Sequence, residues 1–491
     1  MRLISVLLVR RSQKAKRASS ELMEVVHSRN GKPLISKNGY VWCRDKTNKN
    51  GTIAFRCVVK TCSSRGLASE ALDDFDERQP HNHPPDQSKV EIRKRRNTLK
   101  IAVLEQPTAP MKRLYNQAFA DVEDDDNVVN VPPLKSIRTS LYNERSKRLP
   151  KLPATAAEIR LTNEWRETKN GADFILVDTE DENEHRIIAF GTAANLRLLA
   201  ASNTYFMDGT FHTSPSQFYQ LFIIHVVKFD TMIPVIYALL PNKLEATYNR
   251  LFESIKAKAT QLGMTLQPEI VQTDLEKALQ NAATTSFNPQ RLRACYFHFC
   301  QCVWRKVQTV GLTIRYKEDD VVGKFVRRAL GLPFLPLNLV DDVWMDVISS
   351  MDANDGNLVQ FMDYITINFV DEYNAAFPRE IWTQFDNVLG DELIIRTNNH
   401  LEGFHGKIKK YFGRHPSIYV FIENLKNEQE SQELNLRLMR AGTETKEKQK
   451  KKYQRATEKL VSLRRLLDSG EISAYEFCGK CAAVSISQKS K

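Results

Sequence analysis

The strongest constraint on the fold of this chain is the alternation of strand-like and helix-like segments between residues 173 and 299. Five apolar segments of strand length come first: DFILVD, RIIAFGT, YFMDGTF, FYQLFIIHVVKF and MIPVIYALL. The next segment has apolar residues at helical spacing, at Tyr248, Leu251, Phe252 and Ile255. PEIVQTD, LEKALQNAATTSF and RLRACYF then predict a strand, a helix and a strand. This order predicts an α/β fold in which helices cover a mixed sheet.

The composition of the 491-residue chain is typical of a globular protein of several domains, because it is 42% hydrophobic and 26% charged. We expect no membrane span, because no apolar run approaches the roughly 20 residues that cross a bilayer. We expect no signal peptide, because the apolar stretch from Leu3 to Val9 is short and no small-residue cleavage site follows it. Eight cysteines are too few for a disulfide scaffold, which leaves metal binding or burial as their roles.

Changes in composition divide the chain into five expected regions. They are a basic N-terminal flank (1–25), a small β-rich module (26–87), a basic and then acidic linker that is partly helical (88–160), the sheet domain (161–425) and a charged helical C-terminal region (426–491). The sheet domain is interrupted by a mostly helical insertion at about 313–395.

The positive charge of the chain, a net +12, favours a polyanionic partner. Two dense basic runs, Arg10 to Arg17 and Ile92 to Lys100, are candidates for nuclear import or for contacts with phosphates. Solvated flanks are the alternative for both runs. We take Arg93, Lys94, Arg95 and Arg96 as the DNA-binding candidates and expect the protein in the nucleus.

Two cysteines and two histidines in the β-rich module have the spacing of a metal site. Four residues separate Cys57 from Cys62, and one residue separates His81 from His83. Two thiolates and two imidazoles make a closed tetrahedral structural zinc site. A module of about 60 residues needs such a cross-link, because its small hydrophobic core alone supplies little stability. The alternative is a buried cysteine pair with surface histidines.

The stretch from Gly39 to Pro85 resembles the FLYWCH-type zinc finger. That family has a GY strand, an aromatic-x-Cys, a second Cys and a His-x-His followed by proline, which are here Gly39, Tyr40, Cys57, Cys62, His81 and His83. Phe55 stands where the family usually has tryptophan. The resemblance implies structural Zn²⁺ and sequence-directed DNA binding, although such fingers also bind proteins.

Three carboxylates are candidates for a second metal site. Asp208 ends one predicted strand, Asp274 ends another, and Glu402 lies in the first turns of a predicted helix. Three carboxylates that meet repel each other unless divalent cations neutralise them, so a shared site predicts Mg²⁺ or Mn²⁺. Each acid also has an alternative role when it is considered alone. For Asp208 this is a turn cap, for Asp274 the N-cap of a helix, and for Glu402 an exposed helical position.

From about Thr204 to Lys410 the chain resembles a Mutator-like element (MULE) transposase domain. The motifs MDGTF, TDLEKAL, CYFH and TNNHLEGFH occur in that family's order. The resemblance implies a ribonuclease H-like mixed sheet with a helical insertion. It also implies that Asp208, Asp274 and Glu402 form an Asp-Asp-Glu triad that cleaves and joins DNA with two metal ions.

The resemblance also leaves alternatives open. Cys295 and His298, in CYFH, either line the active site or fix a strand–helix junction, and with Cys300 and Cys302 a second zinc site is formally open. The expected partners are transposon ends and target DNA. The alternative is a domesticated DNA-binding regulator that binds regulatory sites and no longer cuts.

The C-terminal region is expected to hold one charged helix from Ser431 to Asp468. A stripe of Leu460, Leu463 and Leu467 on this helix either packs within its own domain or pairs two subunits. The last cysteine pair, Cys478 and Cys481, is half a zinc site, so we expect no metal there.

Overall fold

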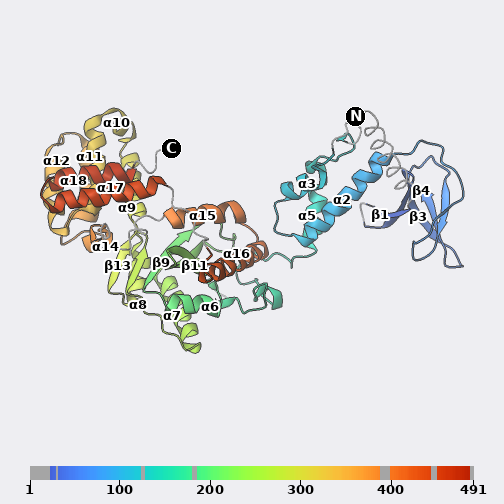
Figure 1. The fold of residues 1–491 in the computed structure, drawn as a ribbon, viewed down its shortest axis with the longest axis horizontal. Coiled ribbons are helices and arrows are strands. Elements are labelled where there is room, and N and C mark those ends of the chain that lie inside the picture. The colour runs from blue at the N-terminus through green and yellow to red at the C-terminus, as the bar shows by residue number, and fades with distance from the viewer. Residues whose placement is uncertain are drawn as a thin grey trace. The chain divides into compact units, whose positions relative to one another are not determined.

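The protein is described by a computed structural model, which covers residues 23–28, 31–122, 128–179, 185–386, 399–443 and 451–486. The side chains of residues 163, 399–402, 451–454, 485 and 486 lie outside the described part. The chain forms two compact units, Met1–Leu152 and Pro153–Lys491 (Figure 1). Within the described residues, no helix is long and apolar enough to span a bilayer.

The first unit begins with an antiparallel sheet whose six strands are neighbours in chain order. The strands are β1 (Glu24–His27), β2 (Pro33–Lys37), β3 (Tyr40–Thr47), β4 (Ile53–Cys57), β5 (Arg65–Ala68) and β6 (Asp76–Glu77). Trp42 and Phe55 are fully buried in its core, and Phe75 packs against both rings. The expected β-rich module is therefore present, and Phe55 has an aromatic packing role.

In the described part of the first unit, three helices follow the sheet. They are α2 (Gln87–Glu105), α3 (Met111–Phe119) and α5 (Leu134–Ser146). The side chain of Asp86 caps α2 by accepting a hydrogen bond of 2.9 Å from the backbone N–H of Lys89. Leu99, Leu114 and Leu141 form a shared core, and Val90 of α2 packs on the sheet. The region expected to be a linker therefore contains a small helical cluster joined to the sheet.

The second unit contains a mixed sheet in the order β13-β12-β9-β10-β11-β8-β7. Its strands are β7 (Ile175–Asp178), β8 (Ile188–Phe190), β9 (Thr204–Thr210), β10 (Gln220–Lys228), β11 (Thr231–Leu240), β12 (Ile270–Thr273) and β13 (Arg291–Ala294). β12 pairs in parallel with both β9 and β13, whereas the other pairs are antiparallel. All seven coincide with segments that the sequence predicts as strands, except that β9 and β11 each begin one residue earlier, and the mixed α/β architecture is confirmed.

Helices cover both faces of this sheet (Figure 1). One face carries α6 (Ala193–Ala200), α7 (Glu245–Gln261) and α8 (Lys277–Phe287), and the other carries α15 (Asn399–Phe412) and α16 (Ile418–Arg440). Tyr205 and Met207 of β9 join the core under α6, α7 and α8. Because side chains alternate along a strand, Asp208 faces α15 instead. The ring of Phe404 on α15 lies 5.2 Å from that of His225 on the same face of the sheet.

A helical body lies beyond the edge of the sheet that β13 forms (Figure 1). It comprises α9 (Tyr296–Thr309), α10 (Thr313–Glu318), α11 (Asp320–Gly331), α12 (Val340–Ser349), α13 (Gly356–Ile365), α14 (Arg379–Trp382), α17 (Lys451–Asp468) and α18 (Ala474–Ile486). Its core joins Phe299 of α9 and Phe325 of α11 to Leu460 and Leu463 of α17. The leucine stripe of α17 therefore packs within its own unit, which is the first of the two roles expected for it.

The single helix expected from Ser431 to Asp468 is wrong. Helix α16 ends at Arg440, and Gly442 then has a left-handed backbone with φ +74°. The N–H of Thr443 donates to the carbonyl oxygen of Leu438 at 3.0 Å, which closes a Schellman motif. Glycine adopts this conformation without a Cβ penalty, so the helix stops there and α17 begins at Lys451.

The C-terminal cysteines are packing residues. Cys478 and Cys481 of α18 are fully buried, and the thiol of Cys478 donates to the carbonyl oxygen of Arg328 at 3.2 Å. Burial raises the pKa of Cys478 to about 12, so this thiol stays neutral. The backbone of Cys478 lies so close to Gly331 of α11 that a Cβ added at Gly331 would overlap its carbonyl oxygen.

We therefore expect Gly331→Ala to lower the free energy of unfolding by about 1–3 kcal/mol, because the two helices would have to separate. Thermal unfolding followed by circular dichroism measures the change. Gly356→Ala is the matched control, because no atom lies within 4 Å of a Cβ there. Equal unfolding temperatures for the two variants would contradict the close contact between α11 and α18.

Candidate metal sites

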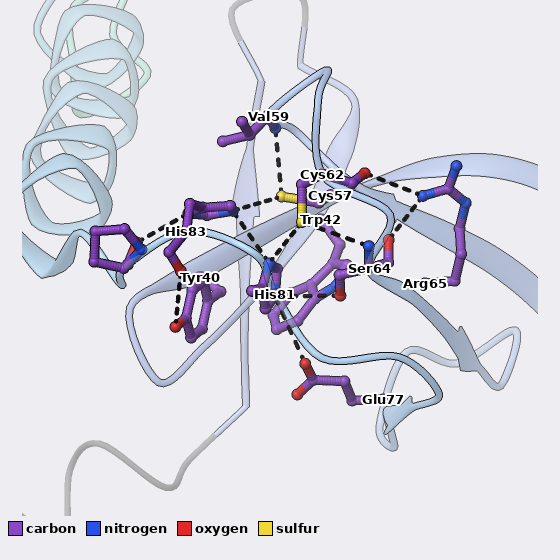
Figure 2. A network of polar contacts seen from close by, with 11 residues as sticks. Tyr40, Trp42, Cys57, Val59, Cys62, Ser64, Arg65, Glu77, His81 and His83 are labelled. Atoms are coloured by element: carbon purple, nitrogen blue, oxygen red, sulfur yellow. Dashed lines mark hydrogen bonds and ion pairs between the residues drawn. The ribbon is translucent and has the colours of Figure 1, made fainter.

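The two cysteines and two histidines of the first unit converge on one point (Figure 2). Cys57 ends β4, Cys62 follows in the next turn, and His81 and His83 follow β6. The Sγ of Cys57 lies 3.3 Å from the Nε2 of His83, and the Sγ of Cys62 lies 3.3 Å from the Nδ1 of His81. The two histidine nitrogens are 3.2 Å apart.

These separations fit a zinc ion. A tetrahedral ion with bonds of about 2.3 Å to sulfur and about 2.0 Å to nitrogen separates its ligand atoms by roughly 3.3–3.8 Å. Each histidine also has a partner for its other ring nitrogen. The Nδ1 of His83 lies 2.9 Å from the carbonyl oxygen of Pro84, and the Nε2 of His81 lies 3.3 Å from the Oγ of Ser64. Such contacts orient the ligand nitrogens.

Electrostatics favour the metal-binding forms of His81 and Cys62 and disfavour that of Cys57. Burial, with the neighbouring charge of His83, lowers the pKa of His81 to about 4, so its imidazole is neutral at pH 7. Burial raises the pKa of Cys57. Burial also acts to raise the pKa of Cys62, but backbone N–H groups, first that of Asn82, lower it overall. The ring of Tyr40 stacks on His81 at 3.7 Å and holds it in place.

The acidic candidates of the second unit meet at the end of two parallel strands. Ile270 of β12 pairs with Thr204 of β9, and the same register places Asp274 level with Asp208. Each of Asp208, Asp274 and His298 offers one ligand atom, and these atoms all lie within 4.8 Å of one another. Asp208 is only 5% exposed. Two of the three predicted acids therefore come together, and His298 from the first turn of α9 joins them.

Without a bound cation, the surroundings of Asp274 destabilise the ionised form of its carboxyl group. Burial, with the negative charge of Glu276, raises its pKa to about 6, although Lys243 opposes the shift. Within the described residues, the Oδ1 atom of Asp274 is buried without a hydrogen-bond partner. A divalent cation would satisfy this oxygen and neutralise the pair. The two carboxylates suit Mg²⁺ or Mn²⁺, whereas the imidazole of His298 better suits ions such as Zn²⁺, Fe²⁺ or Ni²⁺.

Neighbouring residues fix the position of this site. The Oε1 of Glu276 accepts a hydrogen bond of 2.8 Å from the hydroxyl of Tyr248 and its Oε2 forms an ion pair with Lys243, so its side chain is held away from the three ligand atoms. The hydroxyl of Tyr248 accepts a hydrogen bond of 2.8 Å from Gln220. A Cβ added at Gly209 would overlap the side chain of Gln220, which explains the glycine after Asp208.

The third predicted acid, Glu402, lies in α15, but its side chain is outside the described part of the chain. The same helix does reach Asp208. The Nδ1 of His405 lies 3.7 Å from the Oδ2 of Asp208, and burial lowers the pKa of His405 to about 4. His405 was not among the predicted site residues. Its position one helical turn after Glu402, in LEGFH, was the signal available in the sequence.

Cys295 and His298 of the CYFH motif lie in different surroundings. Cys295 is the N-cap residue of α9, is 1% exposed, and donates its N–H to the carbonyl oxygen of Thr273 at 2.9 Å. It therefore lies at the strand–helix junction, whereas His298 lies with the two acids. In the described part of the chain, Cys300 and Cys302 belong to neither candidate metal cluster.

The basic run proposed for DNA binding lies on α2, and two of its basic side chains form ion pairs with acidic residues of the first unit. Lys94 forms an ion pair with Glu24. The Nε of Arg95 lies 3.1 Å from the Oε1 of Glu91, and its Nη1 lies 3.4 Å from the Oδ2 of Asp121. Arg93 and Arg96 are half-buried on the same helix.

In a comparison with protein families, the model of the MULE transposase domain matches residues 204–302. The matched segment runs from β9 into α9. It contains Asp208, Asp274, Cys295 and His298, and it ends before Glu402. No curated protein matches the chain.

For the first unit, we expect one zinc ion per chain, and we expect Cys57→Ser to remove it, because the closed site then lacks one of its two thiolates. Metal analysis of the purified protein measures the zinc content, and thermal unfolding reports the accompanying loss of stability. Cys43→Ser is the matched control, because Cys43 lies on β3 outside the cluster. Full zinc content in Cys57→Ser would contradict the assignment.

For the second unit, we expect Mn²⁺ to bind and Asp274→Asn to weaken this binding by about tenfold or more, because one anionic ligand is lost. Binding should also weaken as the pH falls through about 6, where protons compete for Asp274. Titration calorimetry measures both effects. The control is Asp346→Asn, at an exposed position of α12, which should leave Mn²⁺ affinity unchanged. If both variants lost the same amount of Mn²⁺ affinity, the site would be refuted.

Proposed function

We propose that this protein is a DNA transposase, or a descendant of one, that cleaves and joins DNA phosphodiesters at the site of Asp208, Asp274 and Glu402. The observation that carries the proposal is the pair of acids that meet at neighbouring strand ends, inside the segment that matches the MULE transposase domain. The mixed sheet, with three antiparallel strands followed by two parallel ones, supports a ribonuclease H-like fold.

The proposed roles of the residues follow from their surroundings. Asp208, Asp274 and Glu402 would hold two Mg²⁺ or Mn²⁺ ions, which in such enzymes activate the attacking oxygen and stabilise the leaving oxygen. His405 contacts Asp208 and would keep its carboxylate in place. His298 lies beside both acids and can contact the phosphate or a metal ion. Burial of these groups strengthens every charge interaction at the site.

The first unit would direct the protein to DNA. Its Cys57, Cys62, His81 and His83 cluster supports a zinc finger of the FLYWCH type, which would recognise transposon ends in the nucleus. The candidates for phosphate contacts are the basic residues of α2, Arg93, Lys94, Arg95 and Arg96, of which Lys94 and Arg95 also pair with acidic residues.

A second candidate function is a DNA-binding regulator that does not cut. The observation that favours it is the placement of the zinc site and the acidic site in different compact units, because binding can then persist after cleavage is lost. If the finger binds protein instead of DNA, affinity should depend only weakly on salt, whereas contacts with phosphates weaken steeply as salt rises.

We expect the purified protein to nick DNA that carries its terminal sequences in the presence of Mg²⁺, and we expect Asp208→Ala to reduce the rate by about a thousandfold or more. A strand-cleavage assay on labelled DNA measures this rate. Asp346→Ala, on an exposed face of α12, should cut at the normal rate. Undiminished cleavage by Asp208→Ala would show that another site does the chemistry.

A further inference from the structure

Two exposed aromatic side chains flank the turn that follows Asp208. Phe211 is 42% exposed and Tyr219 is 55% exposed, whereas the largest aromatic residues of the sheet are fully buried. Their rings pack edge to face with centroids 5.3 Å apart. The Nζ of Lys243 lies 4.8 Å from the centre of the Phe211 ring, so this ring already binds a cation.

The end of α15 brings positive charge to the same turn. The N–H of His415 donates to the carbonyl oxygen of His212 at 3.0 Å, and its ring Nδ1 lies 3.0 Å from the carbonyl oxygen of Ser214. Lys409 and Arg414 lie close enough to His212 that, after burial, their charges lower its pKa further. The chain therefore places these two cations beside the turn that carries Phe211.

Among the residues that the structure describes, these cations have no acidic partner. Lys409, Lys410 and Arg414 are exposed, and no ion pair joins any of them to another described residue. By contrast, Lys407 on the same helix pairs with Glu428 at 2.8 Å. Positive charge that the protein leaves uncompensated at one end of a helix is available for an anionic ligand.

Helix α15 links this surface to the acidic site. Its residue His405 contacts Asp208, and Lys409 lies one turn further along, in the direction of the turn at Phe211. Along β9, Phe211 lies three residues after Asp208. The aromatic rings and the cations therefore lie on a path that leads away from the metal-binding acids.

We propose that Phe211, Tyr219, Lys409 and Arg414 form a strand-entry surface that binds an unpaired nucleotide next to the phosphate held at the acidic site. This inference rests on the proposed function and adds the form of DNA that the second unit accepts. An exposed aromatic ring can stack on an unpaired base, whereas bases inside a duplex already stack on each other. Lysine and arginine side chains bind the flanking phosphates.

The test compares the binding of a blunt duplex with that of the same duplex carrying a short single-stranded overhang. Fluorescence anisotropy of labelled DNA reports the affinity of the full chain, with Ca²⁺ in place of Mg²⁺ to prevent cleavage. Both overhang polarities are used. The ratio of the two affinities removes any contribution that the first unit makes through the common duplex.

We expect wild-type protein to prefer an overhang, and we expect Phe211→Leu with Tyr219→Leu to weaken overhang binding by about tenfold while blunt binding stays within about twofold, because only stacking is lost. Tyr373→Leu is the matched control, because its ring is 87% exposed elsewhere on the second unit. Equal affinities for the two DNAs in the wild type, or equal losses in the variant, would overturn the proposal.

The charge component has a separate readout. Lys409→Gln with Arg414→Gln should reduce the slope of log affinity against log salt by about two for overhang DNA, because about one phosphate contact is lost with each cation. Lys459→Gln with Lys480→Gln is the control, since both residues are exposed on α17 and α18. An unchanged slope in the first variant would show that the cations face no phosphate.

Failure of this inference differs from failure of the proposed function. If the protein cuts DNA with Mg²⁺ but does not distinguish overhang from blunt DNA, the strand-entry surface is wrong and the acidic site stands. If it binds overhang DNA through these residues but does not cut, the surface stands and the protein is a binding protein.

Discussion

The parallel pairing of β9 with β12 is the contact on which the acidic site depends. Side chains at the carboxyl ends of two neighbouring parallel strands lie at one edge, so Asp208 and Asp274 approach each other whether or not a cation is bound. Burial and the negative charge of Glu276 raise the pKa of Asp274, and its Oδ1 has no hydrogen-bond partner among the described residues. The sheet can keep this arrangement because the strands around it are deeply buried and pack on helices on both faces.

Helices from distant parts of the chain complete the surroundings of this edge. Helix α9 brings His298 to one side, and α15, which comes after the helical insertion, brings His405 to the other. Helices α17 and α18 then return to pack on α11 and close the core of the helical body. The insertion and the C-terminal region therefore form one structural element, although residues 383–450 separate α14 from α17.

The β-rich module of the first unit stabilises its small core in a different way, by joining it to the Cys and His cluster. Its sheet buries Trp42 and Phe55, and Trp42 donates from Nε1 to the Oγ of Ser64 at 3.0 Å. Ser64 in turn contacts His81, so the hydrophobic core and the metal cluster share one hydrogen-bonded chain. Loss of the metal would therefore disturb the packing of the whole module, as is usual when a small domain depends on a closed metal site.

The sequence alone determined the features that depend on local pattern. These are the strands and helices between residues 173 and 299, the Cys and His spacing of the first unit, and the two acids at strand ends, because each follows from the periodicity or the order of nearby residues. Only the tertiary structure decided which of Cys295 and His298 joins the acids, that His405 contacts Asp208, and that Lys94 has an acidic partner. Those outcomes depend on contacts between segments far apart in the chain, whose geometry no local pattern contains.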